Sequence, residues 1–125
     1  MNVVDSSGWL EYFAGSENAA LFAPAIEDPE QLLVPTITLY EVFKRLIQQA
    51  GISVAQTNIG DMLAGQILDL NDSLALSAAQ IAVELRIPLA DSIILASARE
   101  YHAMLWTQDE HFKGLEGVQY FGKGN

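Results

Sequence analysis

Short apolar runs alternate along the chain with longer stretches in which apolar residues recur at helical spacing. The short runs are β-branched or continuously apolar, and polar or turn-forming residues bound them, which is typical of strands inside a sheet. They predict strands at residues 2–5, 32–34, 67–70, 104–107 and 118–121.

The longer stretches predict helices that each carry an apolar stripe at helical spacing. One stripe consists of Leu39, Phe43, Leu46 and Ala50. A second consists of Leu74, Ala78, Ile81 and Leu85. Segment 6–8 is expected to cap the first helix, Gly51 to stop the third, and Ser73 to cap the fifth. The six predicted helices run up to Phe13, over 17–26, up to Gly51, and over 53–63, 73–86 and 89–102.

The helix at 89–102 is apolar nearly all round, so it is expected inside the protein. Its first turn nevertheless carries a carboxylate, Asp91, and a carboxylate near buried surface is costly unless something pairs with it. The simplest explanation of Asp91 is a helix cap, because Asp is a preferred capping residue and suits the positive end of the helix dipole.

The alternation of strands and helices predicts an α/β fold, a three-layer sandwich with a short, mostly parallel central sheet flanked by helices. The chain shows no internal repeat, low-complexity segment or linker. Residues 1–125 are therefore expected to form a single domain, a common size for one hydrophobic core.

Charge and composition narrow the class of function. The net charge is −10 with only six basic residues, which disfavours passive nucleic-acid binding and suits divalent cations or a basic partner. The absence of cysteine excludes disulfides and thiolate metal sites. The first residues do not resemble a signal peptide and no apolar run is long enough to span a membrane, so we expect a cytoplasmic protein without membrane association.

Four acidic residues from separate segments are expected to converge at one edge of the sheet. Asp5 closes the first strand and Asp109 follows the strand at 104–107, so both lie at carboxyl ends of strands, where ligands bind in parallel α/β sheets. Asp91 begins a helix, and helix starts lie at the same edge in this topology. Glu41 lies just over one turn into the helix that follows the strand at 32–34, away from the predicted apolar stripe.

Each of these acids also has a purely structural interpretation, which the sequence leaves open. Asp5 would end a strand and start a turn, and Asp109 would lie in an ordinary turn. Glu41 would complete a capping box with Thr38 or pair with Arg45 one turn later.

Together the acids favour a metal centre, because carboxylates gathered at one point repel one another unless cations neutralise them. Sites made of oxygen ligands select hard ions such as Mg²⁺ or Mn²⁺, and these ions commonly serve phosphoryl transfer. His102 and His111 lie nine residues apart, which is not a chelating spacing, so we expect surface or turn positions for both.

Four short motifs give the chain a resemblance to a known family over nearly its whole length. They are Val3–Ser7, Tyr40–Val42, Pro88–Ala96 and Thr107–Phe112. In their order and spacing they resemble the PIN-domain ribonucleases, and specifically the VapC toxins of type II toxin–antitoxin systems. The resemblance implies a metal-dependent endoribonuclease with a short parallel sheet flanked by helices.

The acidic quartet of that family is matched by Asp5, Glu41, Asp91 and Asp109. The resemblance implies that the first three hold one or two Mg²⁺ or Mn²⁺ ions, and that Asp109 completes the site directly or through water. One position departs from the family pattern Pro-x-Ala-Asp-Ala, because Ser92 replaces the last alanine. That change leaves the carboxylate in place.

Further expectations follow from the resemblance. Ser6 and Thr107 match hydroxyls that support the site, and Lys44 and Arg45, next to Glu41, are candidate contacts to RNA phosphates, although an exposed helix face explains these two basic residues equally well. The expected partners are RNA, a second copy of the chain, and an antitoxin whose basic C-terminal tail covers the acidic groove.

Two alternative functions stay open from the sequence. The first is a receiver-type signalling domain, in which Asp69, at the end of a candidate strand, would be the phospho-acceptor. The second is a PIN-like fold kept only for protein binding, against which the complete acid set argues.

Overall fold

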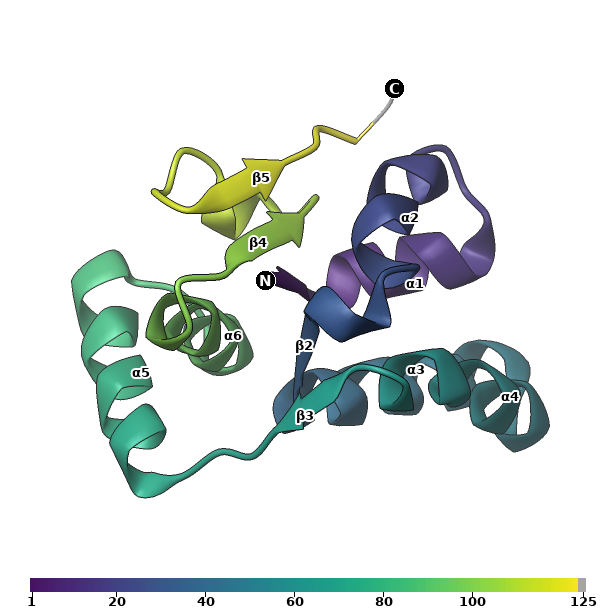
Figure 1. The fold of residues 1–125 in the computed structure, drawn as a ribbon, viewed down its shortest axis with the longest axis horizontal. Helices are drawn as coiled ribbons and strands as arrows, with labels where there is room; N and C mark the ends of the chain where they lie inside the picture. Colours follow the sequence, from purple (N-terminus) through teal and green to yellow (C-terminus); the bar gives the residue numbers. More distant parts are fainter. Residues whose placement is uncertain (124–125) are drawn as a thin grey trace.

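The computed structural model describes residues 1–123 and contains one sheet of five strands in the order β3-β2-β1-β4-β5 (Figure 1). The strands are β1 (Asn2–Val4), β2 (Leu32–Pro35), β3 (Gln66–Leu68), β4 (Met104–Thr107) and β5 (Val118–Tyr120). Every neighbouring pair is parallel, so the predicted mostly parallel sheet is confirmed.

Six α-helices and two short 3₁₀ turns connect the strands within residues 1–123. The helices are α1 (Ser6–Ala14), α2 (Ala19–Ile26), α3 (Thr36–Ala50), α4 (Ile52–Leu63), α5 (Asp72–Leu85) and α6 (Leu89–Glu100). The 3₁₀ turns are η1 (Pro29–Gln31) and η2 (Glu110–Phe112). No helix in this described part of the chain has the length and apolar character needed to cross a membrane.

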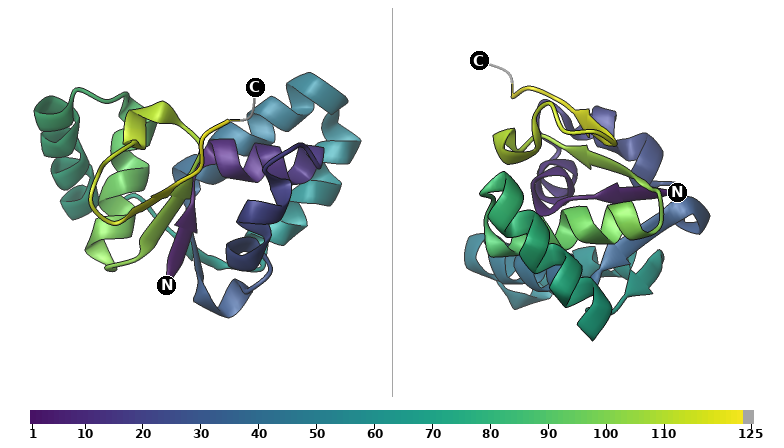
Figure 2. Two further views of the ribbon diagram at one scale, coloured as in Figure 1. Left: turned by 90° about the horizontal axis from the view of Figure 1, so that it is seen from above. Right: turned by 90° about the vertical axis from the view of Figure 1, so that its left-hand side faces the viewer.

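The sheet separates two hydrophobic layers, because successive side chains of a strand point to opposite faces. Val3 and Leu105 pack against α5 and α6 on one face, whereas Val4 and Val34 pack against α1 to α4 on the other. Figure 2 shows these helix layers on either side of the strands. The three-layer α/β sandwich expected from the sequence is therefore confirmed.

Helix α6 lies inside the molecule, as its apolar sequence predicts. All seven residues of Ser92–Ala98 are buried. Its two serines are satisfied within the helix, since Ser92 Oγ donates to the carbonyl of Leu89 and Ser97 Oγ donates to that of Ile93, each at 2.7 Å. Helix α6 thus packs between the sheet and α5.

The buried stripe of α3 differs from the predicted one. Thr38, Val42 and Leu46 are buried, whereas Leu39 and Phe43 are only half-buried. Ala50, the last residue of the predicted stripe, is exposed. The difference arises because α3 packs against α1 and the sheet on one side, while Leu39 and Phe43 face a surface groove shared with α4.

Helix starts also differ from those expected, because side chains other than the predicted ones cap them. Asp5, rather than segment 6–8, caps α1 by accepting a hydrogen bond from the Gly8 amide. Asn71, rather than Ser73, caps α5 through the Leu74 amide at 2.8 Å. Helix α2 begins two residues later than expected.

The order of the strands defines where a ligand would bind. From β1 the chain moves through β2 to the edge strand β3, and then returns to place β4 on the other side of β1. The carboxyl ends of β1 and β4 therefore flank the point at which the direction of winding changes. Such a switch point is the usual ligand crevice of an open α/β sheet.

Candidate active site

Asp5 lies directly after β1 and is almost completely buried, with 2 % of its surface exposed. Its Oδ1 accepts hydrogen bonds from the Ser7 hydroxyl at 2.7 Å and from the Gly8 amide at 3.0 Å. Its Oδ2 accepts one from the Thr107 hydroxyl of β4 at 2.7 Å. Asp5 thus ends a strand, as its structural interpretation expected, but it caps a helix instead of starting a turn, and it also faces the neighbouring strand.

The environment of Asp5 makes its negative charge costly. Burial raises the pKa of Asp5 from 3.8 to about 7, although the hydrogen bonds from Ser7, Thr107 and Gly8 oppose this increase. The charge of Asp109 raises the pKa further. A carboxylate that is buried, oriented on both oxygens and repelled by a second acid would be stabilised in its charged form by a nearby cation.

Asp91 is the third residue of α6, and the helix-cap interpretation is wrong for it. The capping position is Pro88, which makes no side-chain cap bond. Instead, Oδ2 of Asp91 lies 2.8 Å from Nδ1 of His111. Burial and the charges of Asp109 and Glu41 raise the pKa of Asp91, and the contact with His111 lowers it.

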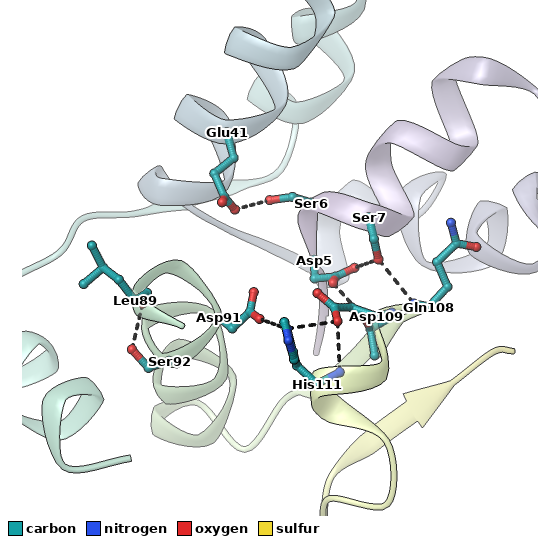
Figure 3. A network of polar contacts seen from close by, with 11 residues as sticks. Asp5, Ser6, Ser7, Glu41, Leu89, Asp91, Ser92, Gln108, Asp109 and His111 are labelled. Atoms are coloured by element: carbon teal, nitrogen blue, oxygen red, sulfur yellow. Dashed lines mark hydrogen bonds and ion pairs between the residues drawn. The ribbon is translucent and has the colours of Figure 1, made fainter. Parts of the chain in front are cut away.

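Asp109 follows β4 by two residues and is held by a turn. Its amide donates to the Thr107 hydroxyl at 2.9 Å, and its Oδ1 accepts from the His111 amide at 2.9 Å. The Thr107 hydroxyl therefore connects Asp5 and Asp109, donating to one and accepting from the other. The turn expected for Asp109 is present, and it directs the carboxylate toward Asp91 (Figure 3).

His111 lies beside the acids, although only a surface or turn position was expected for it. Its side chain is 53 % exposed and belongs to η2, yet Nδ1 contacts both Asp91 and Asp109, the latter at 3.2 Å. The hydrogen bond to Asp91 and the charge of Asp109 raise the pKa of His111. Ligand atoms of Asp91, Asp109 and His111 all lie within 4.8 Å of one another.

Glu41 approaches the site from α3. Its Oε1 accepts a hydrogen bond from the Ser6 hydroxyl at 2.5 Å. The capping-box interpretation is wrong, because α3 begins at Thr36 and the Thr38 hydroxyl has no hydrogen-bond partner in the described residues. Within residues 1–123, no ion pair joins Glu41 to Arg45 either.

The loop between β4 and η2 is held against α1 by Gln108, a residue that was not predicted from the sequence to belong to the site. Gln108 is buried, its amide donates to the Ser7 hydroxyl at 3.3 Å, and its side chain donates to Glu11 at 3.2 Å. Asn18 donates to the side-chain carbonyl of Gln108 at 3.1 Å. These contacts fix the strand end that carries Asp109 against the helix that Asp5 caps.

Figure 3 shows Asp5, Asp91 and Asp109 directed toward a common space, with Glu41 bordering it from α3. The quartet therefore comes from four separate parts of the fold, but only Asp91 and Asp109 belong to the close group with His111. In the described chain no lysine or arginine forms an ion pair with any of the four acids. This donor set is rich in carboxylate oxygen and has His111 as its one described basic partner, and such a set fits a divalent cation.

Lys44 and Arg45 lie elsewhere on α3. Both are exposed, and Lys44 lies 5.7 Å from the ring centre of Tyr40, beside the groove between α3 and α4. Neither contacts the acids in the described structure, so an RNA role would require a substrate that extends from the acidic site along α3.

Comparison with known proteins agrees with the geometry. A family model described as PIN domain matches residues 3–118. None of the curated proteins matches the chain.

Several solved structures share the fold. A toxin–antitoxin complex from Klebsiella pneumoniae is 22 % identical with a TM-score of 0.79, covering 95 % of this chain and 96 % of that one. VapC20 from Mycobacterium tuberculosis, a Sarcin-Ricin loop cleaving toxin, is 18 % identical with a TM-score of 0.77 over 93 % and 95 % of the two chains. VapBC2 from Rickettsia felis, bound to promoter DNA, is 14 % identical with a TM-score of 0.74 over 97 % of each.

The receiver alternative is wrong. The family match identifies a different fold family, and Asp69 follows the edge strand β3 rather than a strand beside β1. A phospho-acceptor at that position would lie away from Asp5 and from the close group of Asp91, Asp109 and His111.

Proposed function

The chain belongs to the PIN domain family, and from this premise we propose that it is a metal-dependent endoribonuclease that hydrolyses RNA phosphodiester bonds. We further propose that it is the VapC-type toxin of a toxin–antitoxin pair, acting in the cytoplasm. The observation that carries the proposal is the convergence of four carboxylates at the switch point between β1 and β4, with no lysine or arginine paired to them in the described chain.

In this proposal Asp5, Glu41, Asp91 and Asp109 hold one or two Mg²⁺ or Mn²⁺ ions. When bound, such an ion supplies Lewis-acid chemistry, lowering the pKa of water and stabilising the negative charge that develops on phosphate oxygens. Buried carboxylates that repel one another suit this role. Burial and repulsion make their charged forms unfavourable, and a bound cation stabilises those charges.

The supporting hydroxyls orient the acids rather than react. Thr107 and Ser7 donate to opposite oxygens of Asp5, so the carboxylate cannot rotate freely. Ser6 donates a hydrogen bond to Oε1 of Glu41 and none to Oε2. Preorganised groups of this kind lower the reorganisation that metal binding and catalysis require.

RNA would enter along α3, where Lys44 and Arg45 provide the exposed basic groups nearest in sequence to Glu41. These two side chains would hold phosphates of an RNA that extends from the acidic site along α3. The strongly negative chain as a whole would repel RNA, so binding would depend on these residues and on the bound metal.

An antitoxin with a basic C-terminal tail fits both the charge and the surface. The net charge of −10 favours a basic partner. The groove of about 620 Å³ between α3 and α4 exposes Leu39, Phe43 and Ile59 to an apolar segment, while the tail would reach the acids. A second copy of the chain would cover the exposed Leu76 and Val83 of α5, and we propose a homodimer.

RNA cleavage by the purified protein tests the proposal. Cleavage of a structured RNA pool is expected with Mg²⁺ or Mn²⁺, and is expected to disappear with EDTA and in Asp91→Asn. Asp69→Asn is the matched control, because it removes an exposed acid outside the site. Cleavage by Asp91→Asn at the parental rate would overturn the proposal. A protein shown free of antitoxin that neither cleaves RNA nor binds Mn²⁺ would support the protein-binding alternative.

A further inference from the structure

One nitrogen lies among the oxygens of the acidic site. Nδ1 of His111 is 2.8 Å from Oδ2 of Asp91 and 3.2 Å from Oδ1 of Asp109. Figure 3 shows the imidazole between the two carboxylates. The three groups each present one donor atom within 4.8 Å of the others, a spacing at which one ion can contact all three.

The backbone holds the imidazole in this place. The His111 amide donates to Asp109 Oδ1, which ties the histidine to the acid two residues earlier. The next residue, Phe112, is fully buried in the core beneath α6 and anchors the 3₁₀ turn. The fold therefore fixes the backbone from which the imidazole projects, and the contacts of Nδ1 with Asp91 and Asp109 place the imidazole itself.

We propose that His111 is a metal ligand, whose Nδ1 joins the carboxylates of Asp91 and Asp109 in holding a divalent transition-metal ion. The inference rests on the metal site of the proposed function and adds a nitrogen to it. Imidazole suits transition metals, whereas Mg²⁺ takes oxygen ligands and water. The site therefore binds Mn²⁺ or Co²⁺ in preference to Mg²⁺, and His111 is the residue that causes the preference.

The competing interpretation is a hydrogen-bonding histidine that only neutralises the two acids. Substitution His111→Gln separates the two roles. Glutamine still carries an N–H donor, one bond further from the backbone than Nδ1, but has no nitrogen lone pair to offer a metal. A merely hydrogen-bonding histidine would be replaced by glutamine with little effect on which metal binds.

Pulsed electron paramagnetic resonance of bound Mn²⁺ tests the ligand directly, because a coordinated imidazole nitrogen couples to the electron spin. The chain has only two histidines, so the tag-free protein labelled with ¹⁵N-histidine gives a signal with few sources. We expect nitrogen coupling in the parent and in His102→Asn, and none in His111→Gln or His111→Ala. Asparagine suits position 102, where φ is 51°.

Calorimetric titration with Mn²⁺ and Mg²⁺ measures the preference. His111→Gln and His111→Ala are expected to weaken Mn²⁺ binding by at least about tenfold, the scale at which even indirect support of a metal site is felt, with a smaller change for Mg²⁺. Circular dichroism establishes that each variant is folded.

The outcomes separate this inference from the proposed function. Stoichiometric Mn²⁺ without nitrogen coupling, or an equal loss of Mn²⁺ and Mg²⁺ affinity in His111→Gln, would overturn the role of His111 while leaving the nuclease intact. No binding of either metal to the parent would overturn both. Where the parent binds both metals, Asp91→Asn is expected to lose both.

Discussion

At the residue scale, the site is a set of acids whose charges the protein makes unfavourable. The pKa of Asp5 is raised to about 7 by burial, and the pKa of Asp91 is raised by burial and by Asp109 and Glu41. His111, the one basic residue paired with these acids in the described chain, is half exposed and contacts only Asp91 and Asp109 among them. Without a metal, the folded protein therefore binds protons at Asp5 and Asp91 more tightly than the unfolded chain does.

These raised pKa values predict how the free energy of unfolding depends on pH. Asp5, Asp91 and His111 all have raised pKa values in the folded state, so the folded state binds more protons than the unfolded state. Their stabilisation is present at low pH and is lost as the pH rises through the folded values, for Asp5 between 3.8 and about 7. With EDTA present, the free energy of unfolding in urea is expected to fall across this window, by on the order of a few kcal/mol.

Asp5→Asn removes the largest of these contributions. Its profile is expected to be flatter than that of the parent, and the variant is expected to be the more stable protein at about pH 8 without metal. Parallel profiles for the two proteins between about pH 4 and pH 7 would show that Asp5 ionises in the folded state as it does in the unfolded chain.

The Thr107 hydroxyl carries a second prediction at this scale. Thr107 is fully buried, donates to Asp5 and accepts from the Asp109 amide, so Thr107→Val leaves polar groups of both acids without a partner. The loss is expected to cost about 1–3 kcal/mol of unfolding free energy, because buried polar groups lose their hydrogen bonds. RNA cleavage is expected to fall as well.

Thr107→Ser is the matched control, since it keeps the hydroxyl and removes only a methyl group. It should retain cleavage and most of the stability measured by urea denaturation. Equal losses in the serine and valine variants would show that packing of the methyl group, and not the hydroxyl, is what position 107 contributes.

The four acids, Ser6 and Thr107 were recognisable from the sequence, whereas Ser7, Gln108 and His111 were not. The positions of the carboxylates were argued from topology, whereas Ser6 and Thr107 were predicted only through the family resemblance. The contacts of Gln108 with Ser7 and of His111 with Asp91 depend on how a loop folds over another element. Such contacts join residues about 20 or more positions apart and leave no periodic signal.

At the element scale, α1 is the support on which Asp5 depends, and Gly8 allows its close approach. A Cβ at this position would lie 2.6 Å from Val4 Cγ1 and 2.7 Å from Phe22 Cε1. Gly8→Ala is therefore expected to displace α1 and to cost about 1–3 kcal/mol of unfolding free energy, as overpacking of a core does. Metal binding should weaken too, because the Gly8 amide positions Asp5.

Gly60→Ala provides the comparison within another helix. Gly60 is exposed in α4, and a Cβ there would meet nothing within 4 Å. That variant is expected to be stabilised by about 0.5–1 kcal/mol through helix propensity. A Gly8→Ala variant as stable as the parent would mean that α1 can shift without loss of packing.

Strands and the buried helix were predictable at this scale, but the orientation of α3 was not. Continuous apolar sequence identifies a buried strand or helix directly, as in Ser92–Ala98. An amphipathic helix reports only that one face is apolar. In α3 the apolar residues cover both the face toward the core and the face toward the groove with α4. Sequence periodicity therefore predicted a buried stripe through Leu39 and Phe43, whereas Thr38 and Val42 are the buried residues.

At the scale of the whole molecule, the acidic site gathers carboxylates from four separate elements of the fold at the switch point. The acids come from the ends of β1 and β4, the second turn of α3 and the first turn of α6. The alternation of strands and helices predicts a parallel sheet, but it does not specify the order of the strands. The order depends on which strands pair with β1. In the structure these are β2 and β4, and both are apolar.

An ion held between these elements is expected to stabilise the molecule as a whole. A ligand that binds only the folded state at about one hundred times its dissociation constant contributes about 2.7 kcal/mol. Addition of Mn²⁺ to metal-free protein should therefore raise the thermal midpoint, measured by calorimetry, and should do so more strongly near pH 8 than near pH 5, because more of the carboxylates are then ionised.

Asp91→Asn distinguishes this effect from a general response of an acidic protein to cations. With a net charge of −10, any divalent ion would relieve some repulsion, and that relief should be nearly the same in Asp91→Asn and in the Asp69→Asn control. A specific site predicts that the midpoint of Asp69→Asn rises with Mn²⁺ as the parent's does, whereas that of Asp91→Asn hardly changes. Equal increases in both variants would place the stabilising ions on the general surface and would leave the four acids without a metal to hold.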